Sequence, residues 1–391
     1  MMASRKSDRA TDCVPLPAVL TSAVSLYTAG METTLYRRPL PAGAIAFSSS
    51  EGRQVFAEAL AAGSLDGYFR LAEQFHTQSD PAFCGLGSLV VALNALAIDP
   101  GRLWKGPWRW FSEDLLDCCV PLDQVRARGL SLDELACLAR CNGAEVELQR
   151  GALEPANLSN FRAALSHSAS AARVLIAAYD RAGLGQTGSG HFSPIAGYHP
   201  DRDLALVLDV ARFKYPPHWI PVERLWRATH ACDPATGLAR GWLLLRARAE
   251  GIALGFSLRC EGVGWQTLAA RLRALPKELE RATELNGIVQ TVLPLAQHVE
   301  LREPSAPAHR EALAGARAAL RAELAYSPIA QLVRPELAEI IVLLLRVMVD
   351  EMQSAQRATL GMSEVSHDLA LASELDNVRA QLSALTSLPP E

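Results

Sequence analysis

The sequence lacks the features that mark membrane, secreted and nucleic-acid-binding proteins. Its longest apolar run, 340–345, ends at Arg346, far short of the roughly 18 residues that a membrane-spanning helix needs. The 8 cysteines in 391 residues are too few for a secreted disulfide scaffold. With 38 basic and 42 acidic residues, the net charge of −4 gives no basic field for nucleic acid or anionic lipid. We therefore expect a soluble, cytoplasmic protein with reduced thiols that binds neither nucleic acid nor membranes.

Length and composition indicate two domains. At roughly 150 residues per domain, 391 residues exceed one small domain. Residues 35–250 mix β-branched runs with amphipathic stretches, which predicts an α+β domain. Residues 251–391 hold 23 Ala and 25 Leu, which predicts a mostly α-helical C-terminal domain. Residues 1–34 are expected to form a loosely ordered extension, and an organellar targeting segment is the alternative.

Two features of the C-terminal region can be interpreted further. Leucine and valine recur at steps of 4, 3, 4 and 3 between Leu371 and Leu385, which predicts the apolar face of a packed helix. Two heptads are too few for a coiled coil, so we interpret this face as an intramolecular contact. Residues 301–307, rich in proline and polar side chains, are expected to form a loop between helices.

Cys84 is the candidate nucleophile. Apolar residues spaced by three and four after Cys84 predict a buried helix that begins just behind it. A cysteine at a helix N-terminus faces free backbone N–H groups and the positive end of the helix dipole, both of which stabilise thiolate. The alternative is a small buried hydrophobic residue without chemistry.

A cysteine nucleophile needs a base and a group that orients the base. Residues 188–198 and 204–210 predict two strands around a turn at 199–202. Antiparallel pairing about residue 200 brings His191 and Asp209 roughly opposite each other, so that Asp209 can hold the imidazole. An acid inside the apolar run 206–210 is costly to bury without such a partner. Gln78 precedes Cys84 by six residues and could donate its amide to an oxyanion.

The order Gln, Cys, His, Asp on a helix and a hairpin resembles the papain-like plan, with Asp where papain-type proteases usually have Asn. Longer strings are similar to the phytochelatin synthase family over residues 35–245. They are LYRR (35–38), QSDPAFCG (78–85) with its helix to 96, IDPGR (98–102), WKGPWRWF (104–111), LDCC (116–119) and DVARFKYPPHW (209–219). The C-terminal region shares no such strings and lacks the Cys-rich tail common in plant members.

The resemblance implies a papain-like cysteine protease fold and a glutathione γ-glutamylcysteinyltransferase. It implies that Cys84, His191 and Asp209 form the triad and that Gln78 serves the oxyanion. The enzyme would release glycine from glutathione, form a γ-Glu-Cys thioester and transfer it to glutathione or a phytochelatin chain, without an organic cofactor. The family also implies stimulation by heavy-metal ions such as Cd²⁺ or Zn²⁺, bound as glutathione thiolates, and a role in metal detoxification. The sequence leaves open whether the chain forms a homodimer.

The γ-Glu head of glutathione carries a carboxylate and an ammonium group, so its pocket needs a cation beside an anion. Relatives use an Asp and an Arg that match Asp233 and Arg240 here, and Gly190 would let the substrate approach the base. Asp233 could instead simply start a turn with Pro234. Arg212, Lys214 and Tyr215 could contact the acceptor or serve packing.

The remaining thiols offer a metal-site hypothesis. Cys118 and Cys119 are adjacent, and Cys137 and Cys141 share a helix face, so soft thiolates could bind Cd²⁺, Zn²⁺ or Cu⁺. No CxxC pair is present, and buried reduced thiols are the alternative. For the whole chain, the alternatives to a transferase are a peptidase that trims glutathione or its S-conjugates and a non-catalytic metal-sequestering protein.

Overall fold

The computed structural model describes residues 37–101, 103–118, 120–169, 172–247, 256–258, 265–301, 307–325, 327–348, 356, 360 and 369–386. The predicted extension 1–34 and the predicted domain boundary at 250 lie outside these ranges. Within them, no helix combines the length and apolar character that crossing a bilayer requires. The described residues form helices and an antiparallel sheet, which confirms the α+β class.

A seven-stranded sheet forms the centre of the N-terminal part. Its strand order is β1-β6-β5-β4-β3-β7-β2, and every described pair of neighbours runs antiparallel. The strands are β1 (Ile45–Ala46), β2 (Ala144–Arg150), β3 (Val174–Asp180), β4 (Gly190–His199), β5 (Leu204–Val207), β6 (His218–Pro221) and β7 (Gly241–Ala247). Strands β3 and β4 are buried on both faces, because each reads as a nearly continuous run of buried residues.

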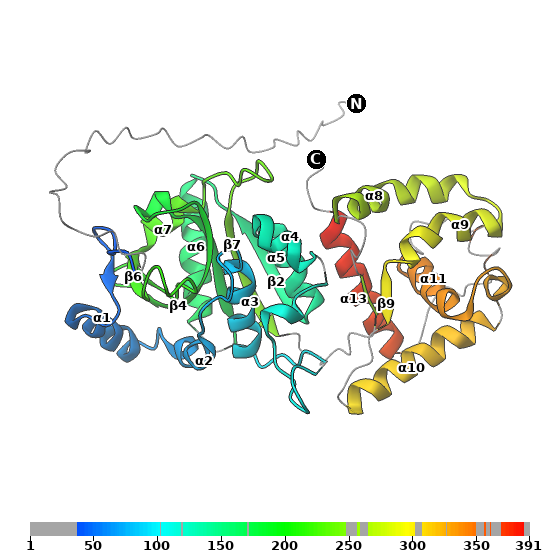
Figure 1. Ribbon diagram of the computed structural model, residues 1–391, viewed down its shortest axis with the longest axis horizontal. Coiled ribbons are helices and arrows are strands. Elements are labelled where there is room, and N and C mark those ends of the chain that lie inside the picture. Colours follow the sequence, from blue (N-terminus) through cyan, green and yellow to red (C-terminus); the bar gives the residue numbers. More distant parts are fainter. Residues whose placement is uncertain are drawn as a thin grey trace, which may run out of the picture.

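Helices cover both faces of this sheet (Figure 1). One face packs against α1 (Ser50–Ala61), α2 (Asp66–Gln74), α3 (Cys84–Ala95) and α5 (Leu132–Cys141), and the other against α6 (Pro155–Ser168) and α7 (Val222–Ala228). The short helix α4 (Leu122–Arg128) leads into α5. Two separate clusters of buried apolar residues fill the two interfaces. The result is a three-layer domain with α3 packed directly on the central strand β4.

Helix α3 begins at Cys84, as its apolar spacing predicts, and it is buried over almost all of its surface. Two glycines in its first turns permit this close packing. A Cβ at Gly85 would lie 3.0 Å from Leu130, and one at Gly87 would lie 3.0 Å from a carboxylate oxygen of Glu113. The start of α3 therefore packs against the side chains of Leu130 and Glu113 more closely than a residue with a Cβ would easily allow.

The C-terminal part is mostly helical, as predicted. It contains α8 (Trp265–Arg281), α9 (Leu285–Ala296), α10 (Pro307–Leu324), α11 (Pro335–Val347), α13 (Leu369–Thr386) and a strand pair, β8 (Phe256–Leu258) with β9 (Val299–Leu301). Of the loop expected at 301–307, Leu301 ends β9 and Pro307 begins α10, while 302–306 lie outside the described residues.

Helix α13 joins the two parts of the chain (Figure 1). It packs against α5 of the N-terminal part and against α8, α10 and α11 of the C-terminal part. Its residues Leu371, Leu375, Val378 and Leu382 are at most 9 % exposed, so the predicted face is an intramolecular contact. The apolar cluster on the α3 side of the sheet continues through this contact into the C-terminal helices.

The predicted hairpin exists, but its register differs from the expectation. Strands β4 and β5 pair His199 with Leu204, and a bulge between Ile195 and Gly197 shifts the pairing by one residue. The turn occupies 200–203 rather than 199–202, which moves the centre of the hairpin toward its C-terminal side. Asp209 therefore does not pair with His191 across the strands. It lies beyond the end of β5, where the chain leaves the sheet.

The contact between β7 and β2 generates a stability prediction. A Cβ at Gly241 would overlap the carbonyl oxygen of Gln149, so Gly241→Ala should cost about 1–3 kcal/mol of unfolding free energy. Gly287→Ala in α9 is the control, because its Cβ would meet only Ala282 at an ordinary 3.7 Å. That change should stabilise by up to about 1 kcal/mol through helix propensity. Thermal melts of both variants check the pair, and equal melting temperatures would contradict the packing.

Candidate active site

Cys84 is the first residue of α3 and is partly exposed. The preceding residue, Phe83, makes no side-chain cap, so capping does not use the amides of the first turn. The backbone N–H of Phe192 on β4 also helps to lower the pKa of the Cys84 thiol. The sulfur thus lies where a helix end and a strand of the sheet meet, both of which offer donors that stabilise a thiolate.

His191 lies on β4, and its Nε2 is 2.8 Å from Oδ1 of Asp209. His191 also lies close enough to Cys84 for its charge to lower the pKa of the thiol, so the imidazole lies between the nucleophile and the carboxylate. Tyr179, the cross-strand partner of His191 on β3, packs edge-on against the ring with centroids 5.7 Å apart. The sheet therefore fixes both the position and the tilt of the base. The three residues predicted to form a triad are brought together.

The charges in this site favour an ion pair between thiolate and imidazolium. Burial raises the pKa of the Cys84 thiol, but His191, the backbone N–H of Phe192 and the charge of Arg181 together outweigh burial and leave the pKa below its ordinary value. Burial lowers the pKa of His191, but Asp209 and Cys84 together outweigh burial and leave that pKa raised. Burial likewise opposes ionisation of Asp209, yet His191 and Arg181 hold its pKa far below the usual range.

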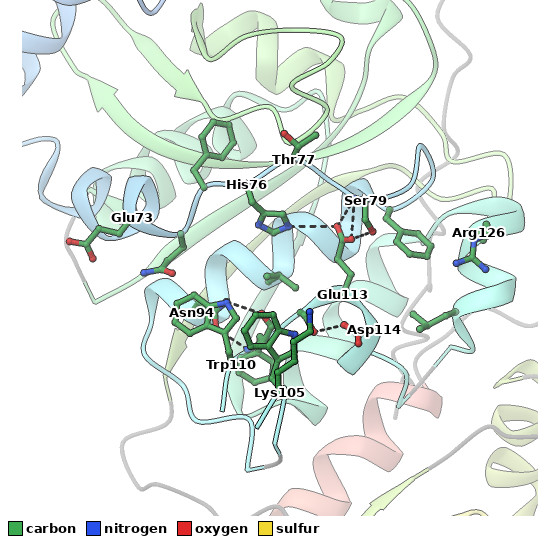
Figure 2. A pocket seen from close by; sticks show the side chains of 18 residues that line it. Glu73, His76, Thr77, Ser79, Asn94, Lys105, Trp110, Glu113, Asp114 and Arg126 are labelled. Carbon is green, nitrogen blue, oxygen red and sulfur yellow. Dashed lines mark hydrogen bonds and ion pairs between the residues drawn. The ribbon is translucent and has the colours of Figure 1, made fainter. Parts of the chain in front are cut away.

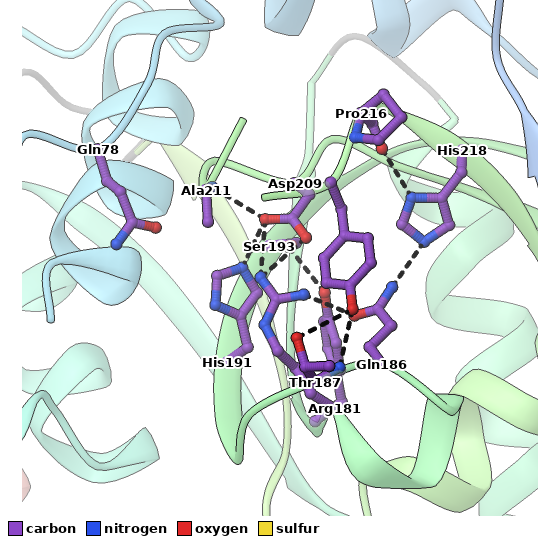
Figure 3. A network of polar contacts seen from close by, with 12 residues as sticks. Gln78, Arg181, Gln186, Thr187, His191, Ser193, Asp209, Ala211, Pro216 and His218 are labelled. Atoms are coloured by element: carbon purple, nitrogen blue, oxygen red, sulfur yellow. Dashed lines mark hydrogen bonds and ion pairs between the residues drawn. The ribbon is translucent and has the colours of Figure 1, made fainter. Parts of the chain in front are cut away.

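Arg181 is a functional residue that the sequence analysis missed (Figure 3). It directly follows β3, is 3 % exposed, and donates Nη2 to Oδ1 of Asp209 at 3.0 Å. Its guanidinium lies over the ring of Tyr215 at 5.1 Å. A buried aspartate demands a cation, which is the only sequence signal for this pairing. That signal does not single out Arg181 among 38 basic residues.

Gln78 is buried beside the site, but its amide is engaged locally. Its Nε2 donates to the carbonyl oxygens of Asp80 at 2.8 Å and Pro81 at 2.9 Å. Its Oε1 is buried without a partner among the described residues. The two carbonyls fix this orientation, because a flipped amide would set oxygen against oxygen. Donation to an oxyanion stays a prediction, and it requires Gln78 to exchange one of these two bonds.

Asp233, Arg240 and Gly190 lie together, as the substrate-pocket hypothesis requires. Arg240 is 7 % exposed, and its Nη1 is 3.8 Å from Oδ2 of Asp233, a loose ion pair. Its Nε is buried without a partner in the described part of the chain. A Cβ at Gly190 would overlap the Arg240 guanidinium, so only glycine fits beside the base His191. The arrangement offers an under-satisfied cation next to the catalytic histidine, which suits a carboxylate ligand.

Two of the three remaining candidates for substrate contact, Arg212 and Tyr215, differ in exposure. Arg212 is exposed and lies over the ring of Phe75 at 4.9 Å. Tyr215 is 1 % exposed, and its hydroxyl accepts from the backbone N–H of Thr187 at 2.8 Å. The ring of Tyr215 therefore packs against the guanidinium of Arg181. The expectation that it touches substrate stays a prediction, and the structure shows its side chain buried.

The cysteines proposed as metal ligands are buried in the core. Cys118, Cys137 and Cys141 are each 1 % exposed, and the Nδ2 of Asn142 lies 3.5 Å from the Cys118 sulfur. Cys119 lies outside the described residues. In the described ranges, no three His, Cys, Asp or Glu side chains come together as a metal site would need. The metal site stays a prediction.

A separate cavity of about 640 Å³ lies beside the loop between α2 and α3 (Figure 2). Its floor is Glu113, which accepts from the backbone N–H of Ser79 at 3.1 Å and lies 3.7 Å from His76. The segment 104–111, one of the strings that carry the family resemblance, forms one wall through Trp104, Lys105 and Trp110. The triad does not line this cavity.

Comparison with known proteins gives a consistent result. The family described as phytochelatin synthase matches residues 35–242. A "Glutathione gamma-glutamylcysteinyltransferase 3" of Lotus japonicus is 47 % identical over 69 % of this chain and 57 % of its own length. Proteins with the same enzyme name from Triticum aestivum and Schizosaccharomyces pombe are 52 % and 37 % identical, over 47 % and 65 % of their lengths. The chain thus spans about half the length of the first two relatives.

The charge arrangement predicts how the thiol reacts. At pH 6.5, iodoacetamide should alkylate Cys84 at least about tenfold more slowly in His191→Ala, because the pKa of the thiol then rises back toward its ordinary value. His199→Ala is the control, since His199 is also buried on β4 but bonds Glu58 away from the site. Peptide mapping of the alkylated protein measures the rate at Cys84 itself. Equal rates of Cys84 alkylation in the two variants would show that His191 does not stabilise the thiolate.

Proposed function

Because this chain belongs to the phytochelatin synthase family, we propose that it transfers γ-Glu-Cys units from glutathione to glutathione or to a growing phytochelatin chain. One observation carries the proposal: inside the matched region His191 is bonded to Asp209 and lies beside Cys84, where it lowers the pKa of the thiol. We also propose that the N-terminal part is papain-like. A cysteine at the start of a helix packed on an antiparallel sheet that supplies the histidine supports this assignment.

The first half-reaction forms a thioester. The Cys84 thiolate attacks the carbonyl carbon of the Cys–Gly amide in glutathione, and the imidazolium of His191 gives its proton to the glycine nitrogen. The C–N bond breaks, glycine leaves, and γ-Glu-Cys stays bound to the sulfur. The N–H groups at the start of α3 are suited to stabilise the oxyanion. The reaction starts from an imidazolium at His191, and Asp209 stabilises this charged form.

The second half-reaction transfers the acyl group. The α-amine of an acceptor glutathione attacks the thioester carbonyl, His191 takes the amine proton, and the thiolate leaves. The product is a peptide longer by one γ-Glu-Cys unit. Water competes for the same thioester, so positioning of the acceptor decides between a transferase and a peptidase. Heavy-metal ions would take part as complexes with the thiolate of the acceptor. We also assign the reaction to the cytoplasm.

The donor site has a chemical rationale for its head-group specificity. The α-carboxylate of the γ-Glu residue would meet the buried guanidinium of Arg240, and its ammonium would meet Asp233. Burial makes this selective, because a ligand without the carboxylate leaves Arg240 under-satisfied. Gly190 supports the same reading, since it lets this pocket adjoin His191.

Incubation with glutathione, with and without Cd²⁺, tests the assignment. We expect free glycine together with (γ-Glu-Cys)n-Gly products of n = 2 or more when Cd²⁺ is present, identified by mass. Cys84→Ser should yield neither product, because a serine hydroxyl at this position is not ionised. Free γ-Glu-Cys as the sole acyl product would instead identify a peptidase. Cd²⁺ binding without glycine release would identify a metal-sequestering protein.

Arg240→Ala tests the donor pocket. Its contact with the substrate is remote from the scissile amide and equal in ground and transition states, so KM should rise while kcat changes little. Losing one charge-assisted bond removes about 1.5–3 kcal/mol, or about 10- to 150-fold in kcat/KM. Arg246→Ala is the control, because Arg246 is exposed on β7 and pairs with Glu145. Steady-state glycine release measures both. An unchanged KM in Arg240→Ala would move the pocket elsewhere.

A further inference from the structure

A turn after β3 sets two buried side chains next to each other. The short helix Ala182–Leu184 and Gly185, which has a left-handed φ of 69°, fold the chain back so that Gln186 N–H donates to the carbonyl of Arg181. The side chains follow, and Nη1 of Arg181 donates to Oε1 of Gln186 at 2.6 Å. Gln186 is 5 % exposed. One end of the guanidinium is thus bound to Gln186 and the other to Asp209.

His218 continues this series of contacts (Figure 3). It is fully buried at the start of β6, where it pairs with Val207, two residues before Asp209. Its Nδ1 is 2.9 Å from the carbonyl oxygen of Pro216, and its Nε2 is 3.3 Å from Nε2 of Gln186. A carbonyl can only accept, so Nδ1 carries the proton and Nε2 accepts from Gln186. Burial lowers the pKa of His218, which agrees with a neutral ring.

These contacts have one consistent direction. The Pro216 carbonyl sets the tautomer of His218, and the tautomer makes the NH₂ of Gln186 face the ring. The oxygen of Gln186 must then face Arg181, which has only donors to offer. No member of the series can be reversed without setting two donors or two acceptors against each other.

We propose that Gln186 and His218 are positioning residues for the acyl transfer, which fix the Arg181 guanidinium on Asp209 and thereby set the charge balance of the Cys84–His191 pair. The inference rests on the proposed function, because it concerns the same nucleophile and base. Neither residue is exposed to touch substrate, so both act through Arg181. No role for them follows from the triad alone.

The sign of their effect follows from the groups around Arg181. The ionisable side chains that face it are Tyr179, Cys84, His191, Asp209, Lys214, Tyr215 and His218. If Arg181 leaves its place, thiolate loses a nearby cation and meets a less compensated Asp209, so the pKa of Cys84 rises. The imidazolium of His191 loses the repulsion of Arg181, and the attraction of Asp209 is no longer offset by that cation. The pKa of His191 therefore rises too. Both limbs of the pH profile therefore move upward.

The tautomer is tested on the unmodified protein. Nitrogen-15 NMR of the full chain labelled at histidine should report His218 as neutral with its proton on Nδ1 between pH 6 and pH 9. A proton on Nε2, or a doubly protonated ring in that range, overturns the series. This measurement needs neither a variant nor substrate.

The coupling to Cys84 is tested with two variants of Gln186. Gln186→Met removes both hydrogen bonds at similar volume, and the acid limb of Cys84 alkylation by iodoacetamide should move upward by on the order of 0.5–1 pH unit. Glycine release should lose about tenfold in kcat at neutral pH with an unchanged KM, as for other supporting polar contacts. Gln186→Glu can still accept from Arg181 and should protonate His218, so it should retain more activity and show a doubly protonated ring.

His199→Gln is the matched control, because it removes a buried histidine of β4 outside the series and should leave the pH profile in place. A lowered melting temperature in Gln186→Met with an unmoved alkylation profile would mean that Gln186 serves packing only, which overturns the proposal. If Gln186→Met shifts the alkylation profile but the unmodified protein releases no glycine from glutathione, the positioning role is supported and the proposed reaction is refuted. The two failures are thus distinguishable.

Discussion

The ion pair between Arg181 and Asp209 is the interaction on which the site depends. Both side chains lie almost completely out of water, and removing such charges from solvent costs several kcal/mol for each ion unless every group is bonded. Oδ1 of Asp209 meets this condition through Arg181, His191 and the backbone N–H of Ala211, and Oδ2 lies 2.9 Å from the Arg181 guanidinium. A carboxylate that must stay ionised in this place raises the pKa of His191, and the charge of His191 in turn lowers the pKa of Cys84.

This constraint explains why the site is distributed over several elements. The helix α3 supplies the nucleophile, β4 supplies the base, and the chain ends of β3 and β5 supply the two buried charges. No element can compensate its own buried charge, since an isolated Asp209 or Arg181 would be costly to bury beside an apolar sheet. Only the packed three-layer domain compensates them. The chemistry is therefore a property of tertiary structure, even though each group is an ordinary side chain.

Local patterns were sufficient for part of this picture. The spacing after Cys84 predicts α3 because helix periodicity is a local property, and the turn near residue 200 predicts β4 and β5 for the same reason. The register of the hairpin was missed, because a bulge leaves no mark in a short apolar run. Arg181, Gln186 and the burial of Tyr215 were missed because nothing nearby in sequence shows which side chains meet across the sheet.

The contact of α13 with α5 also bears on how the protein is made. Helix α5 ends at Cys141 and α13 begins at Leu369, so a ribosome working at about 5–20 residues per second needs on the order of 10–45 s between them. During that interval the apolar outer side of α5 emerges without its native cover. A nascent chain in this state presents a sticky surface to chaperones and to other nascent chains. The speed of translation therefore sets how long this surface of α5 waits for α13 to cover it.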